Sequence, residues 1–180
     1  MPEPEILVLG PDAAPEALAA ARDLMRRFVA WQWVRHADWR HLIDRYFDAD
    51  AFEEELAGLP GKYAPPRGRL LLALLDGSPC GCVALRDLGD GVCEMKRMFV
   101  ALETQRRGVG RALGARLLAE AEGAGYRLMR LDTGTLQHEA KALYESLGFR
   151  RIDPYYDTDP EMAAFLTFME RDLSPASRGS

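Results

Sequence analysis

The hexapeptide QRRGVG at residues 105–110 contains residue types that can bind a phosphate group. It leads directly into RALGARLLAEAEGAG, in which the apolar residues have helical spacing. The N–H groups of the first helical turn have no partners inside the helix and carry partial positive charge, so a helix start attracts anions. Glycine lets a ligand approach the backbone closely, and Arg106, Arg107 and Arg111 add charges that pair with phosphate. The pattern predicts an anion site, although an ordinary turn with solvated arginines has the same residues.

Two familiar nucleotide motifs do not fit this segment. The dinucleotide fingerprint needs a third glycine three residues after the second, and Leu113 stands there instead. A P-loop needs Gly-Lys-Ser/Thr after its glycines, and no such sequence follows. Taken alone, the hexapeptide therefore identifies no particular cofactor.

The rest of the chain predicts an α/β protein with a central sheet that is mixed, mostly antiparallel and flanked by helices. Short apolar runs bounded by turn residues predict strands at 6–9, on both sides of the DGSP turn within 69–85, and at 92–100, 126–133, 149–153 and 164–173. Helical spacing predicts helices from Pro15 towards Trp33, over about 38–58, from Val109 to Gly123 or Gly125, and over 136–148. Prolines and glycines at 59–68 predict a loop without regular structure.

Length and composition predict one domain. A chain of 180 residues with 48% hydrophobic content is long enough for one core and short for two. We predict a single domain at 1–173 and a disordered tail at 174–180, where SPASRGS has little to bury. The formal charge of −5 argues against nucleic acid as a partner. The N-terminal residues do not resemble a signal peptide, and no stretch approaches the ~18 apolar residues of a membrane span, so we expect no membrane partner and a cytoplasmic location.

The cysteines and histidines do not have the spacing of a metal site or of a disulfide framework. The three cysteines form no C-x-x-C pair and lie among apolar residues, which is typical of buried thiols in a reducing compartment: Cys80, Cys82 and Cys93. The three histidines have no third ligand at metal spacing: His36, His41 and His138. We therefore expect no bound metal.

The order of the motifs resembles the GNAT superfamily of N-acetyltransferases. In that superfamily, Gln/Arg-x-x-Gly-x-Gly/Ala follows the fourth strand, as QRRGVG here follows the predicted strand at 92–100. A later N-x-x-A-x-x-L-Y-x-x-x-G-F segment corresponds to QHEAKALYESLGF, in which Gln137 replaces the usual Asn. The resemblance covers about residues 70–173. It implies an acyl-CoA N-acyltransferase fold, acetyl-CoA as co-substrate and transfer of the acetyl group to an amine.

The same resemblance assigns the cofactor contacts. The pyrophosphate of coenzyme A would be held by the residues of the glycine motif: Gln105, Arg106, Arg107, Gly108, Val109, Gly110 and Arg111. The strand residues Met98, Phe99 and Val100 would contact the acetyl group and the pantetheine arm, with hydrogen bonds from the backbone of Met98 and Val100. Gln137 would contact the pantetheine arm. Because Gln replaces the usual Asn at this position, the resemblance leaves undecided whether the side chain makes that contact.

Glu94 is the predicted general base. An amine with pKa of about 10.4 is unprotonated in only about one molecule in 2,500 at pH 7, and a positioned base typically adds 10²–10⁴ in rate. Glu94 stands eleven residues before Gln105, where histone-type members of the superfamily carry a strand glutamate. We expect burial beside the cofactor to raise its pKa towards the working range. Alternatively, Glu94 pairs with Lys96 or with an arginine across the sheet, and an ordered water serves as the base.

Tyr144 is the predicted general acid. It stands in ALYESLGF at the place of the superfamily tyrosine that protonates or hydrogen-bonds the departing thiolate. A thiol of pKa near 8.5 is already a fair leaving group, so the reaction has only a modest need for a general acid. The alternative is an aromatic ring packed with Leu143 and Leu147.

The acceptor is predicted only by class. We expect a small-molecule or amino-acid-like amine, with a protein N-terminus or a lysine as the alternative. The predicted acceptor walls are residues 31–33, 36–48 and 59–68. Charged candidates there are Asp44, Asp48 and Glu54 for an amine and Arg67 and Arg69 for a carboxylate, although each is also typical of a solvated surface.

Two functions of other classes remain open at this point. One is a module that senses acyl-CoA without turnover, and the other is a phosphate or nucleotide binder built on the helix start alone. The sequence also leaves open whether a strand edge mediates formation of a homodimer.

Overall fold

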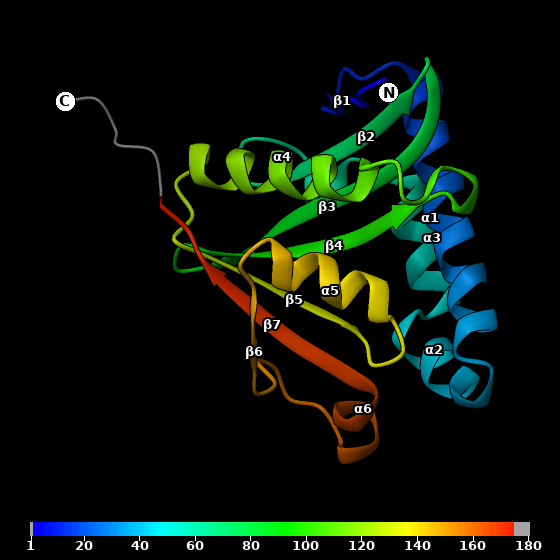
Figure 1. Cartoon of the computed structure of the whole chain (residues 1–180), viewed down its shortest axis with the longest axis vertical. Helices are drawn as coiled ribbons and strands as arrows, with labels where there is room; N and C mark the ends of the chain where they lie inside the picture. Colours follow the sequence, from blue (N-terminus) through cyan, green and yellow to red (C-terminus); the bar gives the residue numbers. More distant parts are fainter. Residues whose placement is uncertain (1, 175–180) are drawn as a thin grey trace.

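The computed structural model describes residues 2–174 and places a seven-stranded sheet at the centre of the molecule (Figure 1). The strand order is β1-β2-β3-β4-β5-β7-β6. Strands β4 and β5 are parallel, and the other neighbouring pairs are antiparallel. The strands are β1 Glu5–Val8, β2 Arg69–Leu75, β3 Ser78–Gly89, β4 Val92–Val100, β5 Leu128–Gly134, β6 Arg150–Ile152 and β7 Leu166–Asp172. The predicted mixed, mostly antiparallel sheet is confirmed.

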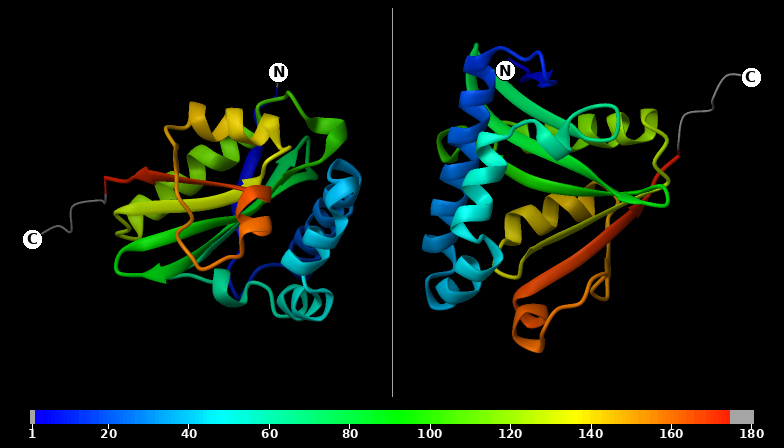
Figure 2. Two further views of the ribbon diagram at one scale, coloured as in Figure 1. Left: turned by 90° about the horizontal axis from the view of Figure 1, so that it is seen from below. Right: turned by 180° about the vertical axis from the view of Figure 1, so that it is seen from behind.

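Helices cover both faces of this sheet (Figure 2). The α-helices are α1 Pro15–Arg35, α2 Arg40–Tyr46, α3 Ala49–Ala57, α4 Val109–Gly123, α5 His138–Ser146 and α6 Pro160–Phe165. Short 3₁₀ turns are η1 Ala37–Trp39, η2 Gly61–Tyr63 and η3 Leu102–Thr104. Helices α4 and α5 cover one face, and α1 with α3 covers the other (Figures 1 and 2). The sheet is thus enclosed as an α/β sandwich.

Strand β2 shows why its sequence is apolar throughout rather than alternating. Successive side chains of a strand point to opposite faces. Leu71 therefore packs with α4 residues such as Leu113, while Leu72 packs with α1 residues such as Met25. All four of these side chains are at most 1% exposed. A strand covered by helices on both faces has no polar side to present.

Three predicted elements differ from the structure for identifiable reasons. The helix expected over 38–58 is broken at Phe47, and α3 restarts where the Asp48 side chain accepts a hydrogen bond from the N–H of Ala51 at 2.9 Å. The strand expected from residue 164 begins only at Leu166, because α6 precedes it. Helix α6 has Asp159 as its N-cap and Pro160 in its first turn, and both residues are typical of a helix start. The apolar residues that follow were interpreted as part of the strand instead.

The loop at 59–68 also differs, since it contains the 3₁₀ turn η2. Most of the predicted disordered tail, residues 175–180, lies outside the described part of the chain.

Candidate active site

The central strands separate halfway along their length and leave a gap. Parallel pairing of β4 with β5 involves only Val92 to Glu94 opposite Leu128 to Arg130. On its other edge β4 stays paired with β3 as far as Val100. A register shift in that pairing accommodates Arg97, whose φ is +59°, a left-handed conformation that is uncommon outside glycine. The second half of β4 therefore turns one backbone edge towards the gap instead of towards a strand.

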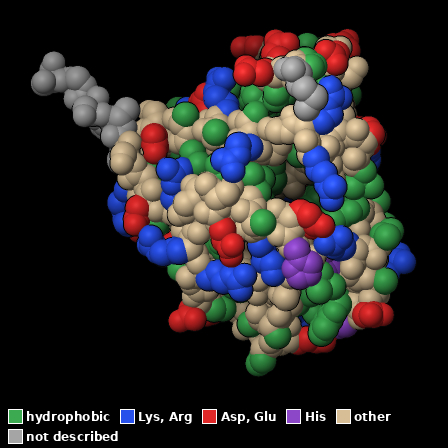
Figure 3. Space-filling model, viewed as in Figure 1, with side chains coloured by type: hydrophobic (Ala, Val, Ile, Leu, Met, Phe, Trp, Pro, Cys, Tyr) green, Lys and Arg blue, Asp and Glu red, His purple; other side chains and the backbone are tan. Residues whose placement is uncertain are grey.

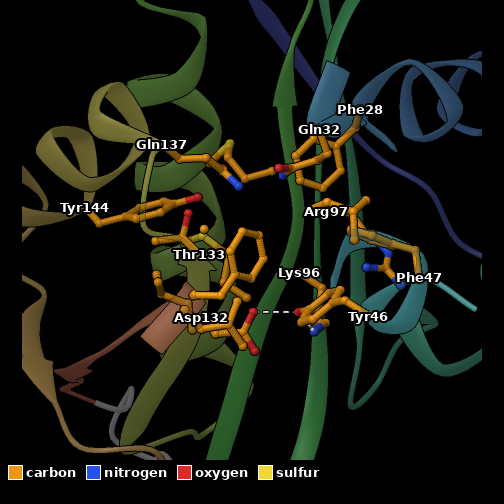
Figure 4. Close-up of a pocket in the computed structure, with 17 residues that line it drawn as sticks. Phe28, Gln32, Tyr46, Phe47, Lys96, Arg97, Asp132, Thr133, Gln137 and Tyr144 are labelled. Atoms are coloured by element: carbon orange, nitrogen blue, oxygen red, sulfur yellow. Dashed lines mark hydrogen bonds between the residues drawn. The ribbon is translucent and has the colours of Figure 1, made fainter. Parts of the chain in front are cut away.

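A cavity of about 50 Å³ occupies this gap (Figure 4). Its walls come from α1, α2, β4, β5, α5 and the junction of α6 with β7, and Met98 and Tyr144 are among the lining residues. Gln32 reaches into it from α1 and Gln137 from the opposite side (Figure 4). The Gln32 Oε1 and Thr133 Oγ1 atoms are buried and have no hydrogen-bond partner among the described residues. Buried polar atoms without partners are rare in folded proteins and here fit a ligand with amide groups, such as the pantetheine arm of coenzyme A.

The glycine motif lies at the start of α4, next to this gap. Gly108 is the N-cap residue with φ of +80°, and it has no side chain to cap the helix. The N–H groups of the first turn are therefore available to an anion. Figure 3 shows the surface hollowed between α4 and α5, above the end of β4, with basic side chains on the rim. A phosphate-bearing ligand would enter the gap along this hollow.

Replacing Gly108 by alanine is expected to weaken coenzyme A binding about tenfold. A non-glycine residue in the left-handed conformation costs about 1–2 kcal/mol, so the loop would relax away from the geometry that presents its N–H groups. Calorimetric titration with coenzyme A measures the effect. Gly123→Ala in the same helix is the control, since a Cβ there meets no atom within 4 Å and should leave binding unchanged. Equal affinity of Gly108→Ala and the unchanged protein would contradict the role of this conformation.

The structure changes the interpretation of Glu94. Its side chain is 1% exposed, Arg86 Nε donates to one carboxylate oxygen at 2.7 Å, and the Tyr155 hydroxyl donates to the other at 2.5 Å. Burial alone raises the pKa of Glu94, but Lys96, Tyr155 and Arg86 outweigh it and leave the pKa below its usual value. The expectation of a raised pKa was therefore wrong, because the sequence did not show these partners. The alternative of pairing across the sheet is the arrangement found.

The position of Tyr144 is compatible with both predicted roles, general acid and packed aromatic ring. Its ring packs against Phe149 within the core, and its side chain also lines the cavity. Burial raises the pKa of Tyr144 and Asp132 raises it further. The hydroxyl therefore keeps its proton through the physiological range and can donate it. Its catalytic role remains a prediction.

A group of polar residues missed in the sequence lies between the cavity and the surface. The Asp132 carboxylate accepts a hydrogen bond from the Tyr46 hydroxyl at 2.5 Å and another from the Tyr156 hydroxyl at 2.8 Å. Lys96 Nζ donates to the Tyr46 oxygen at 2.8 Å. Burial lowers the pKa of Lys96, although Asp132 and Glu94 oppose that effect. Asp132 falls at a polar position between Leu131 and Thr133 of β5, which is the one local signal that could have indicated it.

Two surface openings adjoin the cavity, and Tyr46 and Arg97 line all three spaces. Arg97 Nε lies 2.9 Å from Glu55, whose other oxygen lies 2.8 Å from Lys62 Nζ. The second opening also has charges of both signs on its rim: Arg45, Lys62, Arg86, Asp157 and Asp159. An acceptor that approaches the cavity from this side meets both positive and negative side chains.

The acceptor candidates from the sequence are only partly at these openings. Asp48 and Glu54 line one of them. Asp44 instead accepts a hydrogen bond from the Trp33 indole N–H at 2.8 Å. Arg67 and Arg69 pair with Asp87 and Glu120 and line neither opening. Within residues 2–174, no group of three potential ligands is arranged to hold a metal ion.

A mixed sheet that opens beside an uncapped helix start is typical of proteins that take a coenzyme A thioester between two strands. The chain belongs to the acetyltransferase (GNAT) family, whose model matches residues 21–149. It is therefore an acetyl-CoA-dependent N-acetyltransferase. In the part of the chain that is described, no helix combines the length and apolar character needed to cross a membrane.

Individual proteins agree with this assignment. The chain is 40% identical over 128 residues to an uncharacterized N-acetyltransferase of Schizosaccharomyces pombe, covering 66% of this chain and 78% of that protein. It is 34% identical over 115 residues to the N-acetylaspartate synthetase of Danio rerio, covering 63% of this chain and 40% of that protein. The PaiA N-acetyltransferase of Thermoplasma acidophilum, solved in complex with coenzyme A, shares the fold with a TM-score of 0.69 at 17% identity, covering 95% and 99% of the two chains.

Proposed function

We propose that this enzyme acetylates the primary amine of a small, amino-acid-like molecule by direct transfer within a ternary complex. The observation that carries the proposal is the mixed charge around the opening that leads to the cavity. Arg86 and Lys62 could hold a carboxylate, while Asp132 lies deeper and could hold an ammonium group. An amino acid carries both a carboxylate and an ammonium group, so its carboxylate could stay at the opening while its ammonium group reaches Asp132. The name of the Danio rerio relative, an N-acetylaspartate synthetase, is consistent with such an acceptor.

In this mechanism the chain binds both substrates at once. Acetyl-CoA supplies the thioester. The first turn of α4 and the arginines at 106, 107 and 111 would hold its pyrophosphate, and the free edge of β4 at Met98 and Val100 would hold the pantetheine arm and the acetyl carbonyl. The acceptor nitrogen then attacks the carbonyl carbon directly. Tyr144 would give its proton to the departing sulfur.

A thiol-release assay tests this acceptor class. We expect coenzyme A release from acetyl-CoA with L-aspartate, L-glutamate or another free amino acid, and much slower release with tyramine or spermidine, which lack a carboxylate. Turnover restricted to a peptide N-terminus or a lysine-containing peptide would contradict the small-molecule proposal. Binding of acetyl-CoA without turnover of any amine would indicate a sensor. Thermal stabilisation by ATP but not by coenzyme A would contradict the cofactor assignment.

A further inference from the structure

We propose that Asp132 is the carboxylate that binds the acceptor ammonium group and removes its proton. This inference rests on the acetyltransferase function proposed above and adds the residue that activates the acceptor. Asp132 lies on β5 beyond the last residue paired with β4, so it stands at the gap itself. It lines both the cavity and the opening that leads to it, whereas Glu94 lines only the opening. A group at this junction can reach an amine that has entered the cavity.

The two carboxylates differ in what surrounds them. Glu94 is almost fully buried and lies beside two cations, with Arg86 Nε at 2.7 Å and Lys96 Nζ at 3.8 Å. Asp132 is only half-buried, and it accepts hydrogen bonds from the neutral hydroxyls of Tyr46 and Tyr156. The described residues form no ion pair with it. A half-buried carboxylate that forms no ion pair within the described residues, at the edge of a cavity, attracts a cationic ligand.

The groups that face Asp132 come from four parts of the fold. They are Tyr46 at the end of α2, Lys96 on β4, Tyr144 on α5, and Tyr155 and Tyr156 in the segment before α6. Burial and the Asp132 charge raise the pKa of all four tyrosines. The tyrosines thus remain hydrogen-bond donors, and Lys96 is the one positive group in this set.

The proton and electron balance of the step is simple. One N–H proton of the acceptor ammonium moves to an Asp132 oxygen, which frees the nitrogen lone pair. The C–N bond forms and the C–S bond breaks, with the sulfur leaving as a thiolate that receives the Tyr144 proton. A second proton from the nitrogen returns to the Tyr144 oxygen. The products are an acetamide, the coenzyme A thiol and one proton, which Asp132 releases to water.

Adjacent tyrosines provide a matched test. The Tyr156 hydroxyl donates to Asp132, and the Tyr155 hydroxyl donates to Glu94 at 2.5 Å. Each phenol donates a hydrogen bond that stabilises the charged form of its own carboxylate, and the phenylalanine variant removes that hydrogen bond. We expect Tyr156→Phe to move the acidic limb of kcat/KM to higher pH by about half a unit or more, and Tyr155→Phe to leave it in place. The substrates are acetyl-CoA and the amine of the thiol-release assay that the unchanged enzyme acetylates fastest. A shift with Tyr155→Phe alone would make Glu94 the base and overturn the proposal.

Two carboxylate variants complete the experiment. Asp132→Asn is expected to lower kcat/KM by about 100-fold or more without changing the Kd for coenzyme A, whereas Glu94→Gln should keep the position of the acidic limb. One outcome is that the unchanged enzyme acetylates one of the amines in the thiol-release assay while Asp132→Asn keeps normal activity and an unchanged pH profile. That result would overturn this inference but not the proposed function. Absence of thiol release by the unchanged enzyme with every amine would overturn the proposed function and this inference together.

Discussion

Replacing Glu55 by glutamine is expected to lower the free energy of unfolding by about 3 kcal/mol at pH 7. Burial by itself raises the pKa of Glu55, but the hydrogen bonds and charges of Arg97 and Lys62 lower it to about 2, from the ordinary 4.5 of a glutamate. A difference of that size between folded and unfolded chains corresponds to about 3 kcal/mol. The side chains of Arg97 and Glu55 are 10% and 11% exposed, so the variant would leave a guanidinium group buried without its counter-ion. Losing one partner of a buried pair typically costs about 3–5 kcal/mol, which agrees.

The pH dependence gives this prediction a second measurement. Because the pKa of Glu55 is lower in the folded chain, its contribution is complete above pH 4.5 and is lost as the pH falls towards 2. Urea unfolding should therefore show a difference between the two proteins that shrinks to about half at pH 3. Glu53→Gln is the control on the same helix, since Glu53 and its partner Arg26 are both more than half exposed. A stability loss as large for Glu53→Gln as for Glu55→Gln, or one independent of pH, would contradict the argument.

The strand at 92–100 and the helix start at the glycine motif could be predicted from the sequence because their signals are local. A glycine-rich turn, a helix start and the strand before them lie within residues 92–123, and each leaves a pattern in consecutive residues. Strand β2 could also be predicted from the sequence, since a strand covered on both faces must be apolar throughout. Short-range patterns therefore predicted the sheet and the place of the glycine motif correctly.

The polar contacts around Asp132 and Glu94 could not be predicted in the same way. The hydrogen bond from Tyr46 to Asp132 joins residues 86 positions apart, and the bond from Tyr155 to Glu94 joins residues 61 positions apart. No local pattern shows such pairs. The direction of the Glu94 pKa was predicted wrongly for the same reason: burial can be inferred from a strand, whereas the charges that oppose it come from other elements.

Replacing Tyr144 by phenylalanine is expected to lower kcat about 100-fold while leaving the Kd for coenzyme A unchanged. The hydroxyl is the one part of this side chain that the substitution removes, and the ring keeps its packing against Phe149. Since burial raises the pKa of Tyr144, the phenol holds a proton at every working pH and can deliver it to sulfur as the C–S bond breaks. Positioned proton donors contribute about 10²–10⁴ in rate, and a thiolate needs such help less than most leaving groups, which favours the lower end.

The measurement must separate loss of the proton donor from loss of structure. Tyr126→Phe is a matched control, because its buried hydroxyl donates to the Arg67 carbonyl oxygen at 2.7 Å and lies outside the residues that line the cavity. That variant should lose thermal stability and keep kcat, since the Arg67 carbonyl loses its hydrogen-bond partner away from the cavity. Tyr144→Phe should show the opposite pattern, with kcat reduced at saturating concentrations of both substrates. If Tyr144→Phe loses stability but retains kcat, its role is packing, and the thiolate leaves with a proton from water.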